Sequence, residues 1–418
     1  MASHPFVTTL INLRGNARGC VYTEPLWAIP FNLYAPYVSI YMLAFGMTDS
    51  QVGLITSVGM VFQIFWMLIS GAITDKFGRK RTTLIFDFIS WSIPCIIWAI
   101  AQDASYFFLA AIVNAVWRVT ANSWTCLLVE DTDHNLLVDV WSWIYIAGLI
   151  TAFVSPITGL LIDKFSLVPT MRGLYVLSFI MMTAKFIVMN FLVKETEQGV
   201  VRMAETRNQP LFSVLRESLS VLQQVLRNPA TMVTAGLMVL LNICWVVKGT
   251  FWSILVTEKL GIPAEHLVIF TFARSVIMLV FYFVVMPRLR YMDVRKPMLW
   301  GLIGLIVSQV ILITVQTGDY WLLIVSTVIE AFSTPAATTL LDKLTVITVD
   351  AKERARITAI LYVMVIVFSS PFGWIAGLLS QVNRSLPFIL NIILFTVSGV
   401  LVFIAARRIK DHETPAPA

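Results

Sequence analysis

The sequence predicts an all-α membrane protein with twelve transmembrane helices. Hydrophobic residues make up 58% of the 418 residues and charged residues only 13%, and the mean hydropathy is +0.82. This composition does not suit a surface that faces water. Apolar stretches of about 20 residues recur along the chain, which is the length that a helix needs to cross a bilayer. The stretches are continuous rather than alternating, and this favours helices over barrel strands.

Polar or charged segments separate the apolar stretches from one another. Arg14 and Arg18 precede the first stretch, and no small-residue cleavage site follows a short apolar core, so the first helix is expected to remain in the mature protein. The expected helices, in order, are 20–46, 51–70, 82–101, 105–129, 138–162, 173–193, 229–256, 265–286, 297–316, 320–342, 356–381 and 387–406.

The distribution of lysine and arginine predicts that both termini are cytoplasmic and that the protein is a multi-pass protein of the inner or plasma membrane. With the N-terminus inside, 22 of the 30 basic residues fall in inner segments. Cytoplasmic loops carry such an excess. The net charge of +6 then reflects topology and contact with anionic lipid, and it does not indicate nucleic-acid binding. The outer loops carry only Lys164, Arg172, Lys259 and Arg384.

The second half of the chain repeats the first in parallel. SPITGLL begins at Ser155 and SPFGWIAGLL begins at Ser370, an offset of 215 residues that also separates Gly46 from Gly261. We therefore expect six-helix bundles at 1–194 and 229–418, joined by a cytoplasmic linker at 195–228 whose part from Pro210 onward is an amphipathic covering helix. Secondary transporters use this plan, with the binding site at the repeat interface near mid-membrane.

The segment between the second and third helices carries a dense group of charges. It reads GAITDKFGRKR from Gly71 to Arg81. Here Gly71 would permit close helix approach and Gly78 would supply a tight turn. The segment resembles the signature loop of the major facilitator superfamily, in which a glycine precedes an aspartate and a basic residue, followed by glycine and further basic residues. The plan of six plus six helices extends the resemblance over the whole chain.

The resemblance implies that this loop is a gate. In that family the aspartate caps a helix of the opposite half and locks the outward-open state, so Asp75 would face the segment from Glu353 to Arg356, where the helix dipole favours a negative charge. Arg79 would pair with a carboxylate such as Glu130. A loop that only sets topology would explain the basic residues but neither of the two glycines nor Asp75.

Three other segments depart from the family pattern. The second half keeps only a remnant of the loop, at 287–296, without a glycine turn. Arg118 fits the arginine of a pattern on the fourth helix, but Asn122 replaces its glycine. Ser155 replaces the first glycine of a pattern associated with antiporters, which continues through Pro156 to Gly159. The direction of transport therefore stays open.

Ionisable residues inside the apolar stretches require an explanation, because each costs roughly 2.5–3.5 kcal/mol near the bilayer centre. In the resembled family, helices 1, 4, 7 and 10 line the central cavity, and Arg118, Lys248 and Glu330 fall on three of these. Glu330 is the only carboxylate that we expect near mid-membrane. The sequence leaves Lys185 and Arg274 open between structural and functional roles. The full set is Arg118, Lys185, Lys248, Arg274 and Glu330, with Asp87 shallow.

Polar and aromatic residues share faces with these charges, which predicts a substrate cavity. The alternative is a structural pair of Arg118 or Lys248 with Glu330, with the tryptophans as packing. Glu330 is also the proton-coupling candidate, because burial favours its neutral form while a basic neighbour favours the ionised one. The substrate-binding candidates are Asn32, Asn114, Trp117, Arg118, Asn122, Asn242, Trp245, Lys248, Trp252, Glu330 and Thr334.

The sequence indicates neither a cofactor nor a metal site. Glu130, Asp131, Asp133 and His134 form what is usually a solvated loop cluster. The absence of a glycine-rich ATP-binding loop predicts that a gradient supplies the energy.

We therefore expect a monomeric, proton-coupled secondary transporter of a sugar, a glycoside or an organic anion, and not an enzyme. The alternatives are a multidrug efflux antiporter and a non-transporting solute receptor. A membrane-embedded hydrolase would need an intramembrane histidine or a nucleophile-elbow pattern, and the sequence has neither.

Overall fold

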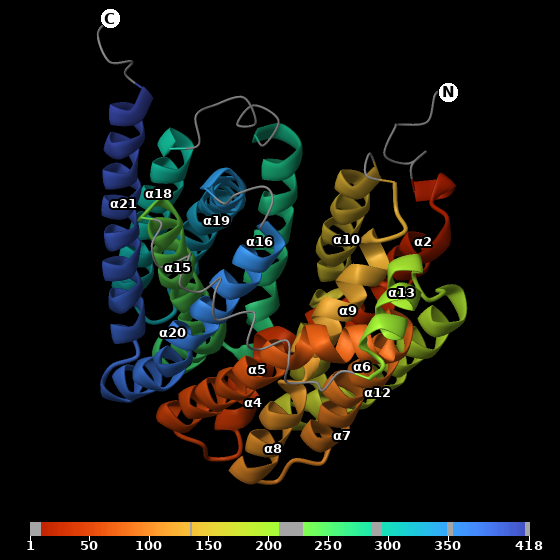
Figure 1. Ribbon diagram of the computed structural model, residues 1–418. Coiled ribbons are helices and arrows are strands. Elements are labelled where there is room, and N and C mark those ends of the chain that lie inside the picture. The colour runs from red at the N-terminus through yellow and green to blue at the C-terminus, as the bar shows by residue number, and fades with distance from the viewer. Residues whose placement is uncertain (1–9, 134–135, 209–228, 286–294, 349–353, 414–418) are drawn as a thin grey trace, which may run out of the picture. The chain divides into compact units, whose positions relative to one another are not determined.

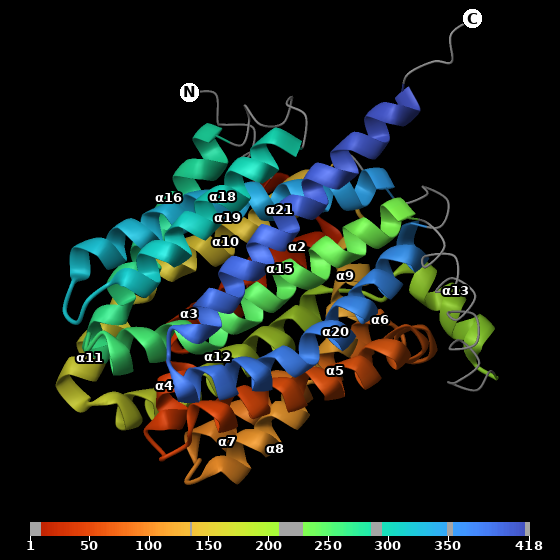
Figure 2. The ribbon, with the colours of Figure 1, turned by 90° about the vertical axis from the view of Figure 1, so that its left-hand side faces the viewer.

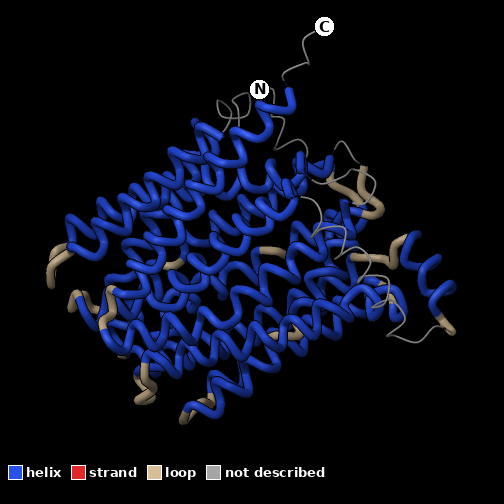
Figure 3. The backbone as a smooth tube through the Cα atoms, turned by 60° about the vertical axis from the view of Figure 1, so that its left-hand side comes forward, coloured by secondary structure: helices blue, strands red, loops and turns tan. Residues whose placement is uncertain are grey.

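Helices form all the regular structure of the described chain (Figure 3). The computed structural model describes residues 10–133, 136–208, 229–285, 295–348 and 354–413. Eleven helices within these ranges are long and apolar enough to cross a membrane. The all-α membrane fold predicted from composition is therefore confirmed.

The first expected transmembrane stretch is the one that is not among the eleven candidate spans of the described residues. It is divided into consecutive short helices, with Pro25 at the start of one, Pro30 inside it and Pro36 in a 3-10 turn. Proline removes a backbone donor and clashes with the preceding turn, so such breaks follow directly from the sequence. These elements are α2 (Gly15–Thr23), α3 (Pro25–Tyr34), η1 (Ala35–Tyr37) and α4 (Val38–Leu43).

The other elements follow the expected order (Figure 1). Those before the linker are α5 (Asp49–Phe77), α6 (Arg79–Asp87), the π-turn η2 (Phe88–Ser92), α7 (Ile93–Ala99), α8 (Ala104–Asn114), α9 (Trp117–Val129), α10 (Leu137–Thr151), η4 (Ala152–Val154), α11 (Pro156–Phe165) and α12 (Leu167–Leu192). Those after it are α15 (Pro229–Ile254), η5 (Leu255–Lys259), η6 (Ala264–His266), α16 (Leu267–Val280), η7 (Phe281–Val285), α18 (Arg295–Thr314), α19 (Tyr320–Thr348), α20 (Arg354–Val382) and α21 (Leu386–Glu413).

The chain divides into two compact units. One contains Met1–Met47 with Val58–Arg216, and the other contains Thr48–Ser57 with Glu217–Ala418. The first turns of α5 thus group with the second unit. The boundaries expected at 194 and 228 stay a prediction.

The linker contains a helix that we did not expect. This helix, α13, spans Glu197–Thr206. The amphipathic helix predicted from Pro210 onward falls within 209–228, outside the described residues.

The internal repeat is visible in backbone geometry. Gly46 and Gly261 both adopt positive φ, at 76° and 66°, a conformation that glycine tolerates and other residues avoid. The second repeated motif diverges between the halves. Pro156 begins α11 after the short turn η4, whereas Pro371 lies inside the continuous helix α20.

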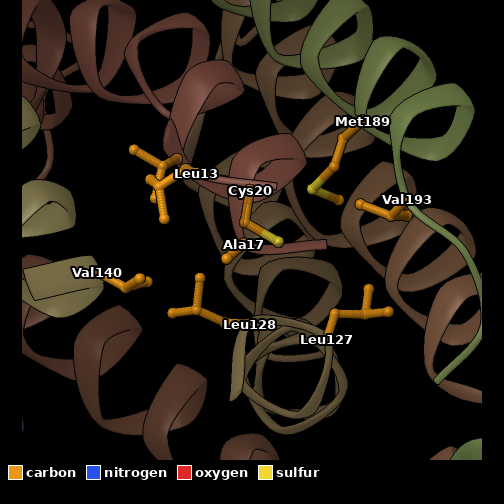
Figure 4. Close-up of a cluster of buried hydrophobic side chains, with 9 residues drawn as sticks. Leu13, Ala17, Cys20, Leu127, Leu128, Val140, Met189 and Val193 are labelled. Atoms are coloured by element: carbon orange, nitrogen blue, oxygen red, sulfur yellow. The ribbon is translucent and has the colours of Figure 1, made fainter. Parts of the chain in front are cut away.

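Each unit has its own apolar core. In the first unit, α2, α9, α10 and α12 bury a cluster that Figure 4 shows around Cys20, made of Leu13, Ala17, Cys20, Val21, Leu127, Leu128, Val140, Met189 and Val193. In the second unit, α15 and α20 bury Ala235, Met238, Ile357, Ile360, Leu361 and Val365.

Candidate functional site

A buried carboxylate in the second unit lies against two cations from different helices. Glu330 of α19 contacts the Lys248 ammonium of α15. A terminal guanidinium nitrogen of Arg274, on α16, lies 3.4 Å from both Glu330 oxygens. The pairing of Lys248 with Glu330 is the structural alternative left open by the sequence, and Arg274 joins it as a second cation.

The exposure of these three side chains differs. Glu330 is 3% exposed and Lys248 is 10% exposed, whereas Arg274 is 31% exposed. The Arg274 Nε atom is buried and has no hydrogen-bond partner among the described residues. Part of the guanidinium therefore has hydrogen-bonding capacity that Glu330 does not use.

Aromatic rings adjoin this cluster. The Lys248 ammonium lies 6.0 Å from the ring centroid of Trp245, at the limit of a cation–π contact. Trp252 is buried and packs edge-on against Phe270 at 5.9 Å. Asn242 on α15 and Thr334 on α19 are half-buried. Their predicted contact with substrate stays a prediction.

The candidate residues on α9 contact groups within the first unit. Arg118 donates from Nε to Gln63 at 2.9 Å, and its guanidinium lies 4.0 Å from the Trp117 ring centroid. Asn122 donates to the Thr74 hydroxyl at 3.2 Å. Each side chain is thus oriented by α5 or by its own helix.

Two further candidate asparagines donate hydrogen bonds to groups at or near helix irregularities. Asn114 donates to the carbonyl of Ser90 at 2.7 Å, within the π-turn η2. Asn32 on α3 donates to the Thr151 hydroxyl at 2.9 Å and the Gly148 carbonyl at 3.3 Å. These bonds satisfy backbone carbonyls where helices are irregular.

A second buried charge cluster, which no sequence pattern indicated, lies in the first unit. Glu24 lies between α2 and α3, and its carboxylate accepts a hydrogen bond from Lys185 of α12 at 2.9 Å. Asp87 is buried, and Thr120 donates to it at 2.7 Å; its expected shallow depth in the bilayer stays a prediction. Glu330 is therefore not the only buried carboxylate of the described helices, and its expected depth near mid-membrane stays a prediction. The available clue was Glu24 itself, a carboxylate directly before a proline in an apolar stretch.

The predicted contact between the signature loop and α9 is present. Arg79 donates from Nε and a terminal nitrogen to Glu130, at 3.0–3.2 Å, and from its other terminal nitrogen to Asp75 at 3.0 Å. Gly78 has φ of 84°, and an added Cβ would lie 2.6 Å from a carboxylate oxygen of Glu195. Gly78 therefore supplies the expected turn and also a close approach.

The close helix approach predicted at Gly71 stays a prediction. An added Cβ on Gly71 would meet no heavy atom of the described residues within 4 Å. The expected contact of Asp75 with the segment from Glu353 stays a prediction, because Glu353 lies outside the described residues. Most of the loop remnant at 287–296 lies outside them as well.

The linker helix α13 binds to the same loop, which Figure 2 shows with α13 beside α6 and α9. Glu195 accepts the backbone N–H groups of Arg79 and Lys80, at 2.7 and 3.1 Å, and so caps α6. Arg202 donates to Asp75 at 3.0 Å, and this hydrogen bond raises the pKa of the guanidinium, which stays cationic. The loop is thus tied to the segment that follows α12.

The opposite end of α5 packs tightly against α20 within the second unit. An added Cβ on Gly377 would lie 2.8 Å from the Asp49 carbonyl oxygen. Ser380 donates to the Asp49 carboxylate at 2.7 Å, and Arg384 donates to it at 3.3 Å. The Ser57 hydroxyl accepts the backbone N–H of Trp374 at 2.8 Å. Polar contacts thus fix both ends of α5, at Asp49 near its start and at Asp75 near its end.

Comparisons with known proteins agree with this architecture. The sequence model of the Major Facilitator Superfamily matches residues 27–289. No curated protein matches the chain significantly.

Many solved structures resemble the fold. A crystal structure of a point mutant of the nucleoside transporter NupG is 13% identical, covers 94% of this chain and 99% of its own, and has a TM-score of 0.72. A POT family transporter in complex with 5-aminolevulinic acid is 13% identical, with coverages of 93% and 94% and a TM-score of 0.70. The human organic anion transporter MFSD10 (TETRAN) is 13% identical, with coverages of 96% and 100% and a TM-score of 0.64.

Proposed function

The chain belongs to the major facilitator superfamily, and we propose that it is a proton-coupled secondary active transporter of a small organic solute. The solute is an organic anion or, as the second candidate, a sugar or glycoside. Transport follows alternating access between two states of the membrane-embedded bundles. The protein acts as a monomer in the cell membrane, in contact with lipid and with both termini in the cytoplasm. It is not an enzyme and requires no cofactor.

The observation that carries this proposal is the cluster of Glu330, Lys248 and Arg274. Two cations share one buried carboxylate, so the site has a surplus positive charge when all three are ionised. Ionisable residues within transmembrane segments mark substrate and ion pathways. The partly exposed Arg274 is the group that a carboxylate or phosphate could reach, since a guanidinium forms two parallel hydrogen bonds with such anions. Arg274 thus contacts Glu330 and is also the side chain that would bind the anionic substrate.

Proton coupling follows from competition for the two cations. When Glu330 is ionised, it satisfies Lys248 and Arg274 and opposes an incoming anion. When Glu330 is protonated, both cations are free to bind the anion. A proton and an anion then bind cooperatively, and linkage requires each to raise the affinity of the other by the same factor. This is the thermodynamic requirement for symport.

Two observations bear on the alternatives. The break at Ser155 and Pro156, between η4 and α11, lies in the motif that resembles the antiporter pattern, and this keeps multidrug efflux as the alternative transport direction. The hydrogen-bonded loop of Asp75, Arg79 and Glu130 favours a protein that changes conformation over a non-transporting receptor.

The test begins with a thermal-shift screen of purified protein against glucose, glucuronate, further organic acids and cationic drugs. Glucose and glucuronate share a ring and differ by a carboxylate, so they separate the two substrate classes. Ligands that stabilise the protein are then assayed in proteoliposomes with and without a pH gradient. A carrier accumulates the ligand, whereas a receptor binds it without flux.

The coupling test uses Glu330→Gln, which mimics the protonated carboxyl. This variant should bind and exchange substrate at the parental rate but lose accumulation driven by the pH gradient. The matched control is Glu258→Gln, which alters a half-exposed carboxylate of the same unit and should leave accumulation intact. If Glu330→Gln accumulates substrate as well as the parent does, with the same pH dependence, Glu330 is only a structural partner of the two cations.

A further inference from the structure

The first unit contains a buried charge cluster that the proposed substrate site does not use. Its members are Glu24, Asp87 and Lys185, which come from three different segments, and all three are buried. The Lys185 ammonium is 2.9 Å from Glu24 and lies 5.8 Å from the ring centroids of both Trp27 and Trp124. Asp87 is close enough for its charge to act on Lys185 and Glu24.

The backbone is irregular at three points around this cluster. Glu24 stands at the break between α2 and α3, and Asp87 is the last residue of α6, directly before the π-turn η2. Thr120, which donates to Asp87, lies in the first turn of α9, after the break that separates α9 from α8. Transporters form ion and substrate sites from interrupted helices, and π-turns occur frequently at functional positions.

The charges of the cluster do not balance. Two carboxyls share one ammonium, so the fully ionised cluster has a surplus negative charge inside a bundle. A buried charge without a partner is costly, and such a group takes up a proton instead. One bound proton makes the cluster neutral.

The contacts indicate which carboxyl holds the proton. Glu24 is bonded directly to the ammonium of Lys185, which favours its ionised form. Among the described residues, the only side chain that hydrogen-bonds the Asp87 carboxyl is the neutral hydroxyl of Thr120, which donates to Oδ1. Oδ2 is then available for the proton.

We propose that Asp87 is a second proton-binding site of the transport cycle, with the Glu24–Lys185 pair as its counter-charges. This inference rests on the proposed function as a proton-coupled carrier. A metal ion is a poorer occupant, because the ammonium of Lys185 already provides the cation. The groups that act on the Asp87 charge from neighbouring elements are Lys185, Thr120 and Glu24, and the buried thiol of Cys20 acts on Lys185.

The apolar core of the first unit lies one helical turn from this cluster. Cys20 precedes Glu24 by four residues and Met189 follows Lys185 by four residues, and both belong to that core (Figure 4). Side chains four residues apart on a helix are neighbours. The apolar core, which includes Leu13, therefore lies between the charge cluster and the N-terminal end of α2. A proton has to reach Asp87 by a route that avoids this core, or after the helices move.

The test reads the proton directly, by infrared difference spectroscopy of the purified protein in lipid as the pH is changed. In a Glu330→Gln background, which removes the other carboxyl that is proposed to bind a proton, the protein should show the carbonyl band of a protonated carboxyl that disappears at alkaline pH. Asp87→Asn should lack this band, while Asp103→Asn, which alters a carboxylate outside the spans, should retain it. The band is measured without any substrate, so failure of the proposed substrate site does not affect the result.

A second variant protects the test against misfolding of Asp87→Asn. Thr120→Val keeps the shape of the side chain but removes the hydroxyl that bonds Oδ1. A carbonyl that loses a hydrogen bond absorbs at higher frequency, so the band should move upward in this variant. In proteoliposomes, Asp87→Asn should exchange substrate but accumulate it no better than vesicles without a pH gradient. An unchanged band in both variants, or parental accumulation in Asp87→Asn, would overturn the proposal and make the cluster structural.

Discussion

The two halves of the chain bury charge in opposite proportions. In the first unit one lysine, Lys185, is bonded to Glu24, and the charge of a second carboxyl, Asp87, also acts on it. In the second unit one carboxyl, Glu330, meets two cations. Both arrangements avoid a lone charge, yet the surplus has the opposite sign in each. A surplus carboxylate can be neutralised by binding a proton. A surplus guanidinium stays protonated, so its charge is balanced by binding an anion.

The two clusters also differ in the exposure of their side chains. The three charged side chains of the first-unit cluster are all buried, and the apolar core around Cys20 adjoins them. In the second unit, Arg274 is partly exposed. A proton needs only a transient path, but an organic anion needs space. Under the two proposals, the first-unit cluster takes up only a proton, whereas the second-unit cluster takes up both a proton, on Glu330, and the solute, at Arg274.

The largest expected effect distinguishes the clusters by stability. Lys185→Met removes the cation that, among the described residues, bonds Glu24 and acts on the Asp87 charge, and breaking a buried pair in this way costs about 3–5 kcal/mol. Lys248→Met should cost less, about 1.5–3 kcal/mol, because Glu330 keeps Arg274. Unfolding of the detergent-solubilised variants measures both losses.

The double variant Glu24→Gln with Lys185→Met is the control for this prediction. It removes the charge that Lys185→Met leaves behind, so it should be more stable than Lys185→Met alone, and the difference gives the coupling energy of the pair. An equal loss for Lys185→Met and Lys248→Met would contradict the proposed contrast between the two clusters.

A second prediction concerns ligand charge. Arg274→Gln removes the surplus cation of the second unit, so affinity for glucuronate should fall about tenfold, which corresponds to about 1.4 kcal/mol. Binding of glucose should change little. Calorimetry on the purified protein measures both affinities, and Arg274→Lys should show an intermediate loss because it keeps charge but not the planar fork.

The contrary result is informative for the substrate class. If Arg274→Gln weakens glucose and glucuronate binding equally, the guanidinium does not read the ligand's charge. The sugar or glycoside reading would then replace the organic anion.

The sequence predicted the membrane fold because its cause is local. A run of about 20 apolar residues is required for each crossing, and these runs are visible without any partner. The turn at Gly78 and the contact of Arg79 with Glu130 could also be predicted, because a short motif and the end of a neighbouring helix specify them.

The pairings inside the bundles could not be predicted in the same way. Glu24 and Lys185 are 161 residues apart, and their contact depends on the rotation of two helices and on the break after Thr23. The burial of Asp87 likewise depends on where the π-turn η2 begins. Helix α13 was missed because ten mostly polar residues have no membrane requirement, and its position depends on contacts such as Arg202 with Asp75.

The smallest expected effect concerns the hydrogen-bonded loop of the first unit, whose counterpart in the second half is only a remnant. Asp75 is bonded by Arg79 and by the half-exposed Arg202. Asp75→Asn should weaken the outward-open state, so a thiol reagent added from the cytoplasmic side should label Thr125→Cys faster in a background without the native cysteines. Arg202→Gln should raise the labelling rate by only about twofold, because exposed ion pairs contribute about 0.5 kcal/mol. Arg207→Gln, an exposed change just beyond α13, is the matched control and should not alter labelling.

Unchanged labelling in Asp75→Asn, with transport at the parental rate, would mean that this loop only sets topology. The two halves would then differ in their buried charges and not in their gates.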